Sequence, residues 1–181
     1  DVIWSGTPET GMRSSHRILS TATHLGDGGF GAATGKPLVY RIMADCHAKN
    51  NAIDDEWLVR DQGAIVRQMG WDPKTYAADL IAREGGPETA TRPLSPDTDI
   101  EGPYKGRGDD NEWGANDARI LHRIMAADLP VIPAEYDRAV QCEDPGGVTA
   151  YGPASVDRFW MALRAALPNA TFQIDHQIGR D

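Results

Sequence analysis

The sequence predicts an α+β fold in which helices cover the concave face of a curved antiparallel sheet. Two patterns support this prediction: strand-like segments fill the first third of the chain, and helices with an apolar stripe follow them. The chain has 181 residues, of which 40% are hydrophobic, and this is enough for one domain with one core.

Three strands are predicted in the first part of the chain. The first covers residues 14–25, which are rich in Ser, Thr and branched side chains, and it leads into a glycine-dense turn. The second covers 38–48 and the third 53–59, with a turn at 49–52 between them. Long antiparallel strands flanked by glycine tend to twist and curl, so this meander is expected to have a concave side.

Two short helices are predicted directly after the strands. In residues 61–70 the apolar side chains fall at helical spacing, and Gly70 suits the position after a helix end. The second helix is expected to begin with Asp72 as its N-cap and Pro73 in its first position. Gly85 and Gly86 would end it.

A polar segment divides the chain into two parts. Residues 87–114 are crowded with Gly, Pro and Asp, which is typical of a linker. A strand-rich part, 1–86, precedes it, and a helix-rich part, 115–181, follows. The elements predicted in the helix-rich part are helices over 115–127, 133–140 and 153–167, a strand-like piece over 148–150, and a strand over 171–178.

The charge and the cysteine content limit the classes of partner. The net charge is −9, from 27 Asp and Glu against 18 Lys and Arg, so nucleic acid and anionic membrane surfaces are poor partners. No apolar run approaches the length of a membrane span, and no signal peptide is visible. The two cysteines, Cys46 and Cys142, make no disulfide framework, so a cytoplasmic location is expected.

The strand over 38–48 carries the candidate chemistry. Alternate residues of a strand share one face, and one face here holds Arg41, Met43, Asp45 and His47. Either this face is solvated and its charges have no role, or it is the concave face and lines a pocket. In a desolvated pocket the pKa of Asp45 would rise, and the carboxyl would act as an acid or base near neutral pH.

Further motifs surround this strand in a recognisable order. They are Thr23-His24, Thr34-Gly35-Lys36, Asp45-Cys46-His47, and Trp57 followed by Asp61. This order resembles the second half of a SnoaL-like polyketide cyclase domain, a family of the nuclear transport factor two-like superfamily. The helix-rich part resembles the first half of the same domain, through Phe159-Trp160, Leu167-Pro168-Asn169 and Phe172.

The two halves of the resembled domain therefore stand in reversed order. The chain is either a permuted domain, in which both halves complete one cone, or the middle of a longer chain with two such domains. The resemblance implies a cystatin-like, cone-shaped α+β fold with Asp45 as the catalytic acid or base at the bottom of its pocket. It implies His24 or His47 as the assisting histidine.

The resemblance also implies a ligand and an assembly. The residues expected to contact the substrate are Arg41, Met43, Trp57, Asp61, Tyr136 and Trp160. The expected ligand is small and apolar or aromatic, no cofactor and no metal ion are expected, and the sheet face that carries Tyr40 and Ile42 would form a homodimer.

The sequence is compatible with three functions. The first is cofactor-independent acid/base catalysis of the cyclase or isomerase type on a polyketide-like substrate. The second is epoxide opening by water that Asp45 activates, with Arg41 as the orienting cation and Asp61 as a second acid. The third is a module that binds a small ligand and dimerises without chemistry.

Overall fold

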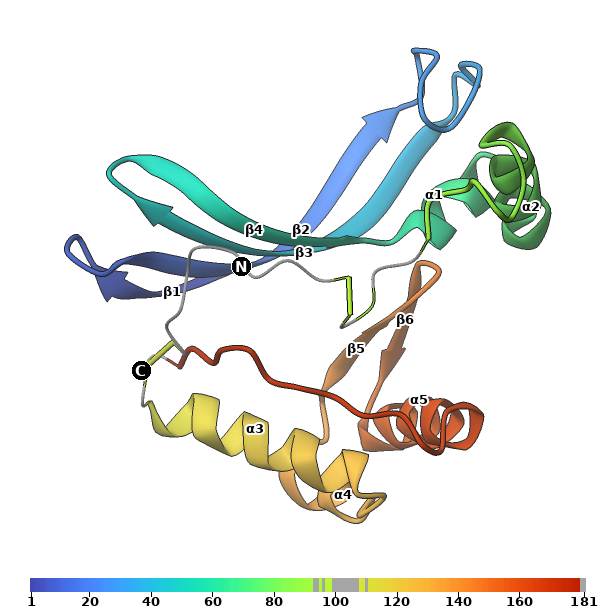
Figure 1. The fold of residues 1–181 in the computed structure, drawn as a ribbon. Coiled ribbons are helices and arrows are strands. Elements are labelled where there is room, and N and C mark those ends of the chain that lie inside the picture. The colour runs from blue at the N-terminus through green and yellow to red at the C-terminus, as the bar shows by residue number, and fades with distance from the viewer. Residues whose placement is uncertain (93–94, 96, 99–107, 110, 180–181) are drawn as a thin grey trace.

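A computed structural model describes residues 1–92, 95, 97–98, 108–109 and 111–179 of the chain, and it has an α+β fold (Figure 1). An antiparallel sheet contains four strands in sequence order. These strands are β1 (Val2–Thr7), β2 (Gly11–Thr23), β3 (Pro37–Lys49) and β4 (Ala52–Arg60). Of the 28 residues of the predicted linker 87–114, 13 lie outside the described residues.

Strands β2 and β3 pair along almost their whole length, from Met12 opposite Ala48 to Thr23 opposite Pro37. A two-residue turn then leads into β4, because Asn50 and Asn51 both have positive φ angles, as a hairpin turn of this length requires. The sequence predicted these three strands close to their observed bounds. It missed β1, whose six residues show no alternation of apolar and polar side chains.

Two short helices follow the sheet, of which the first packs against β3 and the second against the first. They are α1 (Gln62–Gln68) and α2 (Pro73–Arg83), and Asp72 is the N-cap of α2 as predicted. The buried side chains of Ile65 and Met69 form a small core with Leu38 of β3, and Tyr40 packs against it. This is the face of β3 that the sequence assigned to a dimer, so α1 covers one end of it.

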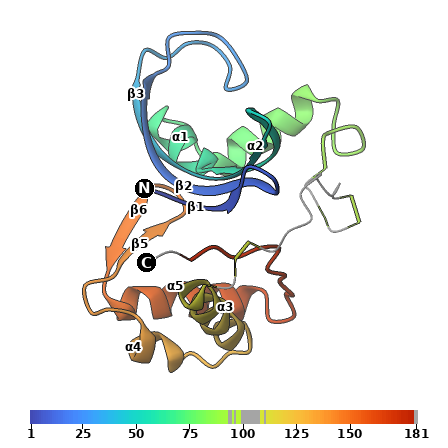
Figure 2. The same ribbon diagram turned by 90° about the vertical axis from the view of Figure 1, so that its left-hand side faces the viewer.

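The helix-rich part lies on the opposite side of the sheet (Figures 1 and 2). Its elements are α3 (Glu112–Met125), α4 (Val131–Glu135), β5 (Gln141–Asp144), β6 (Val148–Tyr151) and α5 (Pro153–Ala166), and β5 pairs with β6 in a separate hairpin. Its core is formed by Ile120, Ile124, Val131, Ile132 and Val156. Tyr136 and Trp160, which were predicted to contact the substrate, pack against this core.

Two predicted helix bounds in this part were wrong. The helix predicted over 133–140 begins at Val131 and ends at Glu135. The carboxylate of Asp137 accepts a hydrogen bond from the backbone N–H of Ala139, which favours a turn over a continued helix. The linker was predicted to reach residue 114, but Asn111 caps α3 through the N–H of Trp113, so the helix starts earlier.

The strand predicted over residues 171–178 is also wrong. This C-terminal segment runs across the face of the sheet, between the sheet and α3 (Figure 1). It makes an isolated bridge between Gln177 and Gly108 but belongs to neither sheet of the described chain. Phe172 contacts His122 of α3 and His176 contacts Asp45 of the sheet, and neither contact is strand pairing.

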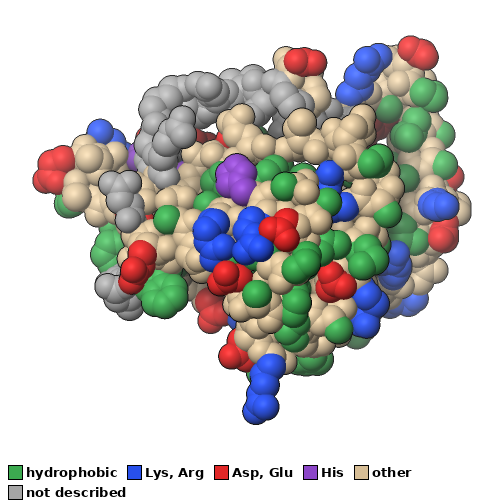
Figure 3. Space-filling view, turned by 90° about the horizontal axis from the view of Figure 1, so that it is seen from below, with side chains coloured by type: hydrophobic (Ala, Val, Ile, Leu, Met, Phe, Trp, Pro, Cys, Tyr) green, Lys and Arg blue, Asp and Glu red, His purple; other side chains and the backbone are tan. Residues whose placement is uncertain are grey.

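The outer surface of the helix-rich part mixes side-chain types. Figure 3 shows basic, acidic and hydrophobic side chains interspersed over this face, with no large patch of one charge sign among the described residues. None of the helices in the described part of the chain has the length and apolar character needed to cross a membrane.

Candidate functional site

A cavity of about 360 Å³ lies between the sheet and α3. From the sheet, Ile3, Ser15 and Asp45 line it. The rest of the lining comes from α3, with Trp113, Gly114, Asp117, Ala118 and Leu121, and from the C-terminal segment, with Ile174, His176, Gln177, Ile178 and Gly179. The cavity therefore brings both parts of the chain together around Asp45.

Asp45 forms a pair with a histidine from the C-terminal segment. Its Oδ2 atom lies 3.1 Å from Nε2 of His176. Nη1 of Arg13 lies 2.8 Å from Nδ1 of the same ring and 3.3 Å from its Nε2. The three side chains thus form a cluster, in which the guanidinium contacts the imidazole and the imidazole contacts the carboxylate.

The surroundings of Asp45 favour its charged form. The hydrogen bond from His176 lowers the pKa of Asp45 below its ordinary value, and a bond from Ser15 and the charge of Arg13 act in the same direction. Burial opposes these effects without cancelling them. The sequence predicted that the pKa of Asp45 would rise. That prediction was wrong, because it accounted for burial but not for the hydrogen bonds.

A second carboxyl of the same cavity is shifted in the other direction. Desolvation raises the pKa of Asp117 above its ordinary value, although the side chain keeps contact with solvent at the edge of the cavity. Its negative charge also contributes, after desolvation, to the raised pKa of Tyr136. One cavity therefore contains a carboxyl whose pKa is lowered and another whose pKa is raised.

This difference predicts opposite effects of two substitutions on stability. A carboxyl whose pKa is raised by folding contributes stability below its unfolded pKa, and that contribution is lost as the pH rises through the folded pKa. Asp117→Asn is therefore expected to raise the urea midpoint at pH 7 and to leave it unchanged at about pH 3. Asp45→Asn should lower the midpoint at pH 7. A carboxyl whose pKa is lowered by folding stabilises the fold at pH values above its unfolded pKa. A less stable Asp117→Asn protein at pH 7 would contradict the assignment.

His47 lies on the same face of β3 as Asp45 but does not line this cavity. The residue is 4% exposed, and its Nδ1 lies 2.5 Å from Oδ1 of Asp54 on β4. Gly11, at the start of β2, lies directly against the ring. The structure therefore places His47 in the packing of the β3–β4 hairpin.

His24, the other predicted histidine, lies at the far end of the long hairpin. It follows β2, whereas Asp45 is paired with Ser15 near the opposite end of that strand. Nδ1 of His24 is 3.1 Å from the hydroxyl of Thr34, which closes the loop between β2 and β3. The structure therefore does not bring His24 to Asp45.

Two of the predicted substrate contacts join the sheet to the β5–β6 hairpin. Arg41 forms an ion pair with Glu143 and donates a hydrogen bond of 3.0 Å to the hydroxyl of Thr149. The carboxylate of Asp61 caps α1 through the N–H of Ala64 and accepts further bonds from the turn between β5 and β6.

The remaining predicted contacts are spread over the molecule. Met43 and Trp57 are 49% and 41% exposed on the sheet, and neither lines the cavity around Asp45. Among the predicted site residues, all of which the structure describes, Asp45 alone lines that cavity. Nowhere in the described chain do three or more His, Cys, Asp or Glu side chains gather as they would around a metal ion.

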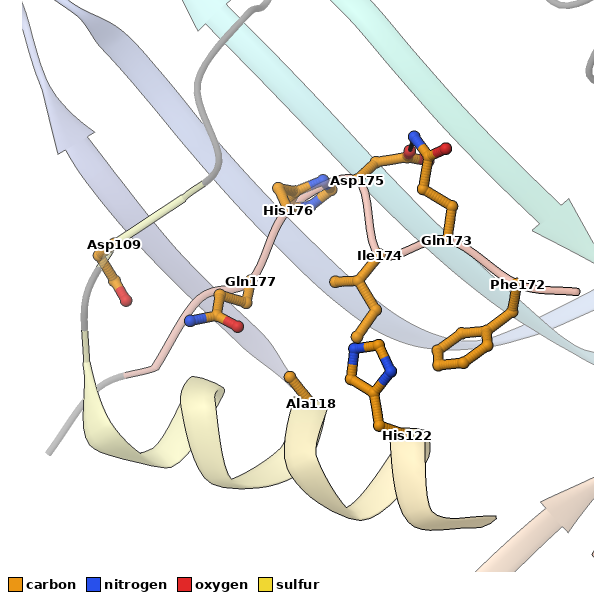
Figure 4. Close-up of a pocket in the computed structure, with 9 residues that line it drawn as sticks. All are labelled: Asp109, Ala118, His122, Phe172, Gln173, Ile174, Asp175, His176 and Gln177. Carbon is orange, nitrogen blue, oxygen red and sulfur yellow. Dashed lines mark hydrogen bonds between the residues drawn. The ribbon is translucent and has the colours of Figure 1, made fainter. Parts of the chain in front are cut away.

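A second cavity, of about 530 Å³, lies beside the same C-terminal segment (Figure 4). It shares Ala118, Ile174, His176 and Gln177 with the first. The rings of His122 and Phe172 meet at one end of it, with their centroids 4.9 Å apart. The segment thus forms a common wall of two adjoining cavities.

Sequence reasoning missed His176, Arg13 and Asp117. The sequence did contain a signal for Asp117, because it follows Trp113 and precedes Leu121 at four-residue spacing, which places a carboxyl on an apolar helix face. No comparable signal marks His176, since it was assigned to a strand whose pairing does not exist.

Comparison with known proteins adds no relative: no family model, no curated protein and no solved structure matches this chain. The resemblance to the SnoaL-like family therefore stays a prediction. The fold and the cavity define an α+β protein in which one cavity contains two carboxyls with pKa values shifted in opposite directions.

Proposed function

We propose that this protein is a cofactor-independent acid/base catalyst of the cyclase or isomerase type, acting on a small apolar or polyketide-like carbonyl compound. One observation carries the proposal: Asp45 and Asp117 line the same cavity, and their pKa values are shifted in opposite directions. Two carboxyls that differ in this way are suited to the roles of base and acid in one reaction.

In the proposed first step, Asp45 accepts a proton from a carbon next to a carbonyl group. The electron pair of that C–H bond forms a C=C bond, and the carbonyl oxygen takes a proton from Asp117, which gives an enol. Where the enol is conjugated with a second C=C bond, Asp45 returns its proton to a different carbon and the enol O–H proton returns to Asp117, which restores the carbonyl group and completes an isomerisation.

A cyclisation begins with the same enol. Its carbon attacks a second carbonyl carbon of the substrate and forms the new C–C bond. The resulting alkoxide takes the proton from Asp45, and the enol O–H proton returns to Asp117. Both carboxyls are then restored, and no atoms are gained or lost.

We further propose that the two parts of the chain complete one cone of the SnoaL-like kind in permuted order. The placement of the helix-rich part supports this, because α3 and the C-terminal segment pack over the face of β3 that carries Asp45. Contacts of Arg41 and Asp61 with the β5–β6 hairpin support it as well.

The geometry favours this function over epoxide opening. That reaction needs an arginine and a second acid beside Asp45. Arg41 is bound to Glu143, and the carboxylate of Asp61 is occupied by backbone N–H groups. Neither side chain lines the cavity.

The proposal can be tested by proton exchange, which requires no knowledge of the product. A panel of aromatic ketones and β-diketones is incubated with the protein in D₂O, and the loss of α-proton signals is followed by NMR. Asp45→Asn is expected to slow exchange of an accelerated probe by about 10²–10⁴-fold, because a positioned base is removed. Asp79→Asn on α2 is the control, since Asp79 is an exposed carboxylate outside this cavity.

The outcomes separate catalysis from binding. Equal exchange rates for the wild-type and Asp45→Asn proteins, with unchanged circular dichroism spectra, would contradict the proposal. A probe that binds in the cavity and is recovered with its α-protons unexchanged would favour the module that holds a ligand without chemistry.

A further inference from the structure

We propose that two copies of this chain associate by antiparallel pairing of their β4 strands, with the two-fold axis at Leu58. The partner is a second copy of the same chain, and the two four-stranded sheets join into one continuous sheet. This surface is the edge of the sheet, whereas the sequence predicted a dimer through the face that carries Tyr40 and Ile42. The inference does not depend on the proposed reaction.

Strand β4 is an exposed edge of the sheet. In the described chain it pairs with β3 alone, and of its residues only Asp55 is partly buried. An edge strand presents backbone N–H and C=O groups to which another strand can pair. Natural proteins usually protect such an edge with charged side chains or a β-bulge.

Only the first half of β4 has this protection. Residues 54–56 are all acidic. The pairing with β3 also shifts there, since His47 lies opposite Asp55 and Ala48 opposite Ile53, so that Asp54 is the additional residue of a bulge. The pairing of two copies is therefore limited to the second half of the strand.

The second half of β4 is apolar on both faces. Trp57 and Val59 lie on the face of the sheet that carries Asp45, and Leu58 lies on the other face. Val59 is 70% exposed and Leu58 is 44% exposed. A run of exposed apolar side chains on an edge strand indicates that another surface covers it.

The sequence of this half complements itself. Residues 56–60 read Glu-Trp-Leu-Val-Arg. A two-fold axis at Leu58, perpendicular to the sheet, places Glu56 opposite Arg60 of the second copy. It places Trp57 opposite Val59 of the second copy, and Leu58 opposite its own counterpart. Opposite charges and aromatic or apolar side chains that face each other across two strands stabilise the pairing.

The two charged side chains are available for these pairs. Glu56 and Arg60 are exposed, and Arg60 forms no ion pair with another residue of the described chain. The carboxylate of Glu56 accepts a long bond of 3.8 Å from the thiol of Cys46. The charges of both side chains therefore remain free to pair with the second copy.

Other positions of the axis fit less well. An axis at Trp57 would place Glu56 opposite Leu58 of the second copy, which leaves the charge without a partner. An axis at Glu56 would place two carboxylates opposite each other, and like charges in this position are destabilising. Pairing about a two-fold axis uses the same strand in both copies, so it closes at the dimer.

Charge reversal tests the pairing. Arg60→Glu and Glu56→Arg each place two pairs of like charges across the axis, and each is expected to raise the dissociation constant of the dimer by about tenfold or more, measured by sedimentation velocity. The double variant restores the opposite charges and the net charge of the wild-type protein, so it should dimerise as the wild-type protein does. A mixture of the two single variants should form a heterodimer, because the glutamates of one chain then face the arginines of the other.

Lys74→Glu is the matched control for these variants. Lys74 is exposed on α2, and its replacement changes the net charge as Arg60→Glu does. This variant is expected to leave the dissociation constant unchanged. Circular dichroism spectra confirm that each variant keeps the fold.

Cysteine cross-linking tests the position of the axis. In Leu58→Cys the two new thiols would lie opposite each other, where the Cα atoms of antiparallel strands are about 5 Å apart, so mild oxidation should give a disulfide-linked dimer. In Glu56→Cys they would be separated by four residues along the strands, or about 13 Å, and no such dimer is expected. Both variants keep Cys46 and Cys142, so the oxidised wild-type protein gives the background.

Three results would overturn the inference. The first is a wild-type protein that stays monomeric over the micromolar range, and the second is a dimer whose dissociation constant is the same in both single variants. The third is a mixture of the single variants that forms no heterodimer. Cross-linking at position 56 instead of 58 would overturn the axis at Leu58.

Discussion

Asp61→Ala is expected to lower the free energy of unfolding by roughly 4 kcal/mol, measured by urea denaturation. The carboxylate accepts three backbone N–H groups, which come from Ala64 at 2.9 Å, Gly146 at 2.9 Å and Gly147 at 2.8 Å. The first bond caps α1, and a lost N-cap costs about 1 kcal/mol. The other two join the sheet to the β5–β6 turn, and hydrogen bonds to a charged acceptor contribute about 1.5 kcal/mol or more each.

Asp72→Ala is the matched control for this substitution. Asp72 is also an aspartate in the N-cap position, but its side chain accepts bonds only within its own helix, from the N–H and hydroxyl of Thr75. Its loss is expected to cost about 1 kcal/mol. Equal losses for the two variants would mean that the bonds from Asp61 to Gly146 and Gly147 contribute nothing to stability.

Gly11→Ala should be nearly as damaging, with a loss of roughly 3 kcal/mol. Gly11 has a φ of +94°, which an L residue adopts only with strain. A Cβ at this position would lie 2.2 Å from Nε2 of His47, so the buried ring would have to move. Its bond to Asp54 would then be broken, and the packing of the β3–β4 hairpin would loosen.

Gly35→Ala separates the two causes. Gly35 also has a positive φ, +68°, but a Cβ added there would meet no described atom within 4 Å. This variant should therefore show the conformational strain alone, at about 1 kcal/mol. If Gly11→Ala were no more destabilising than Gly35→Ala in the same urea titration, His47 would not be fixed by its contact with Gly11.

The sequence predicted the local parts of the fold well and the long-range parts poorly. Strand pairing between β2 and β3 follows from two long strand-like segments and one loop, and the N-cap of α2 follows from Asp72 and Pro73. These features depend on neighbouring residues. Segment 171–178 shows where such prediction fails. Its alternation of side chains resembles a strand, but the segment contacts α3 and the sheet and pairs with no strand.

The candidate site shows the same limit. The alternation of side chains along β3 identified Asp45 as a candidate site residue, and Asp45 lines the cavity. His176 and Arg13, however, are 163 residues apart in sequence, and no spacing rule connects them. Their contact depends on where the C-terminal segment crosses the sheet. For the same reason the sequence could not predict the hydrogen bond that lowers the pKa of Asp45.

The C-terminal segment has a consequence for how the substrate of the proposed reaction would enter. It lies between two cavities and contributes to the walls of both. Within the described chain it joins no sheet and makes an isolated bridge, at Gln177. A segment that belongs to no sheet is expected to open at a small fraction of the free energy of global unfolding. Its transient displacement would merge the two cavities. Under the proposed function, the size of the substrate and the rate of product release would then depend on how often this segment opens.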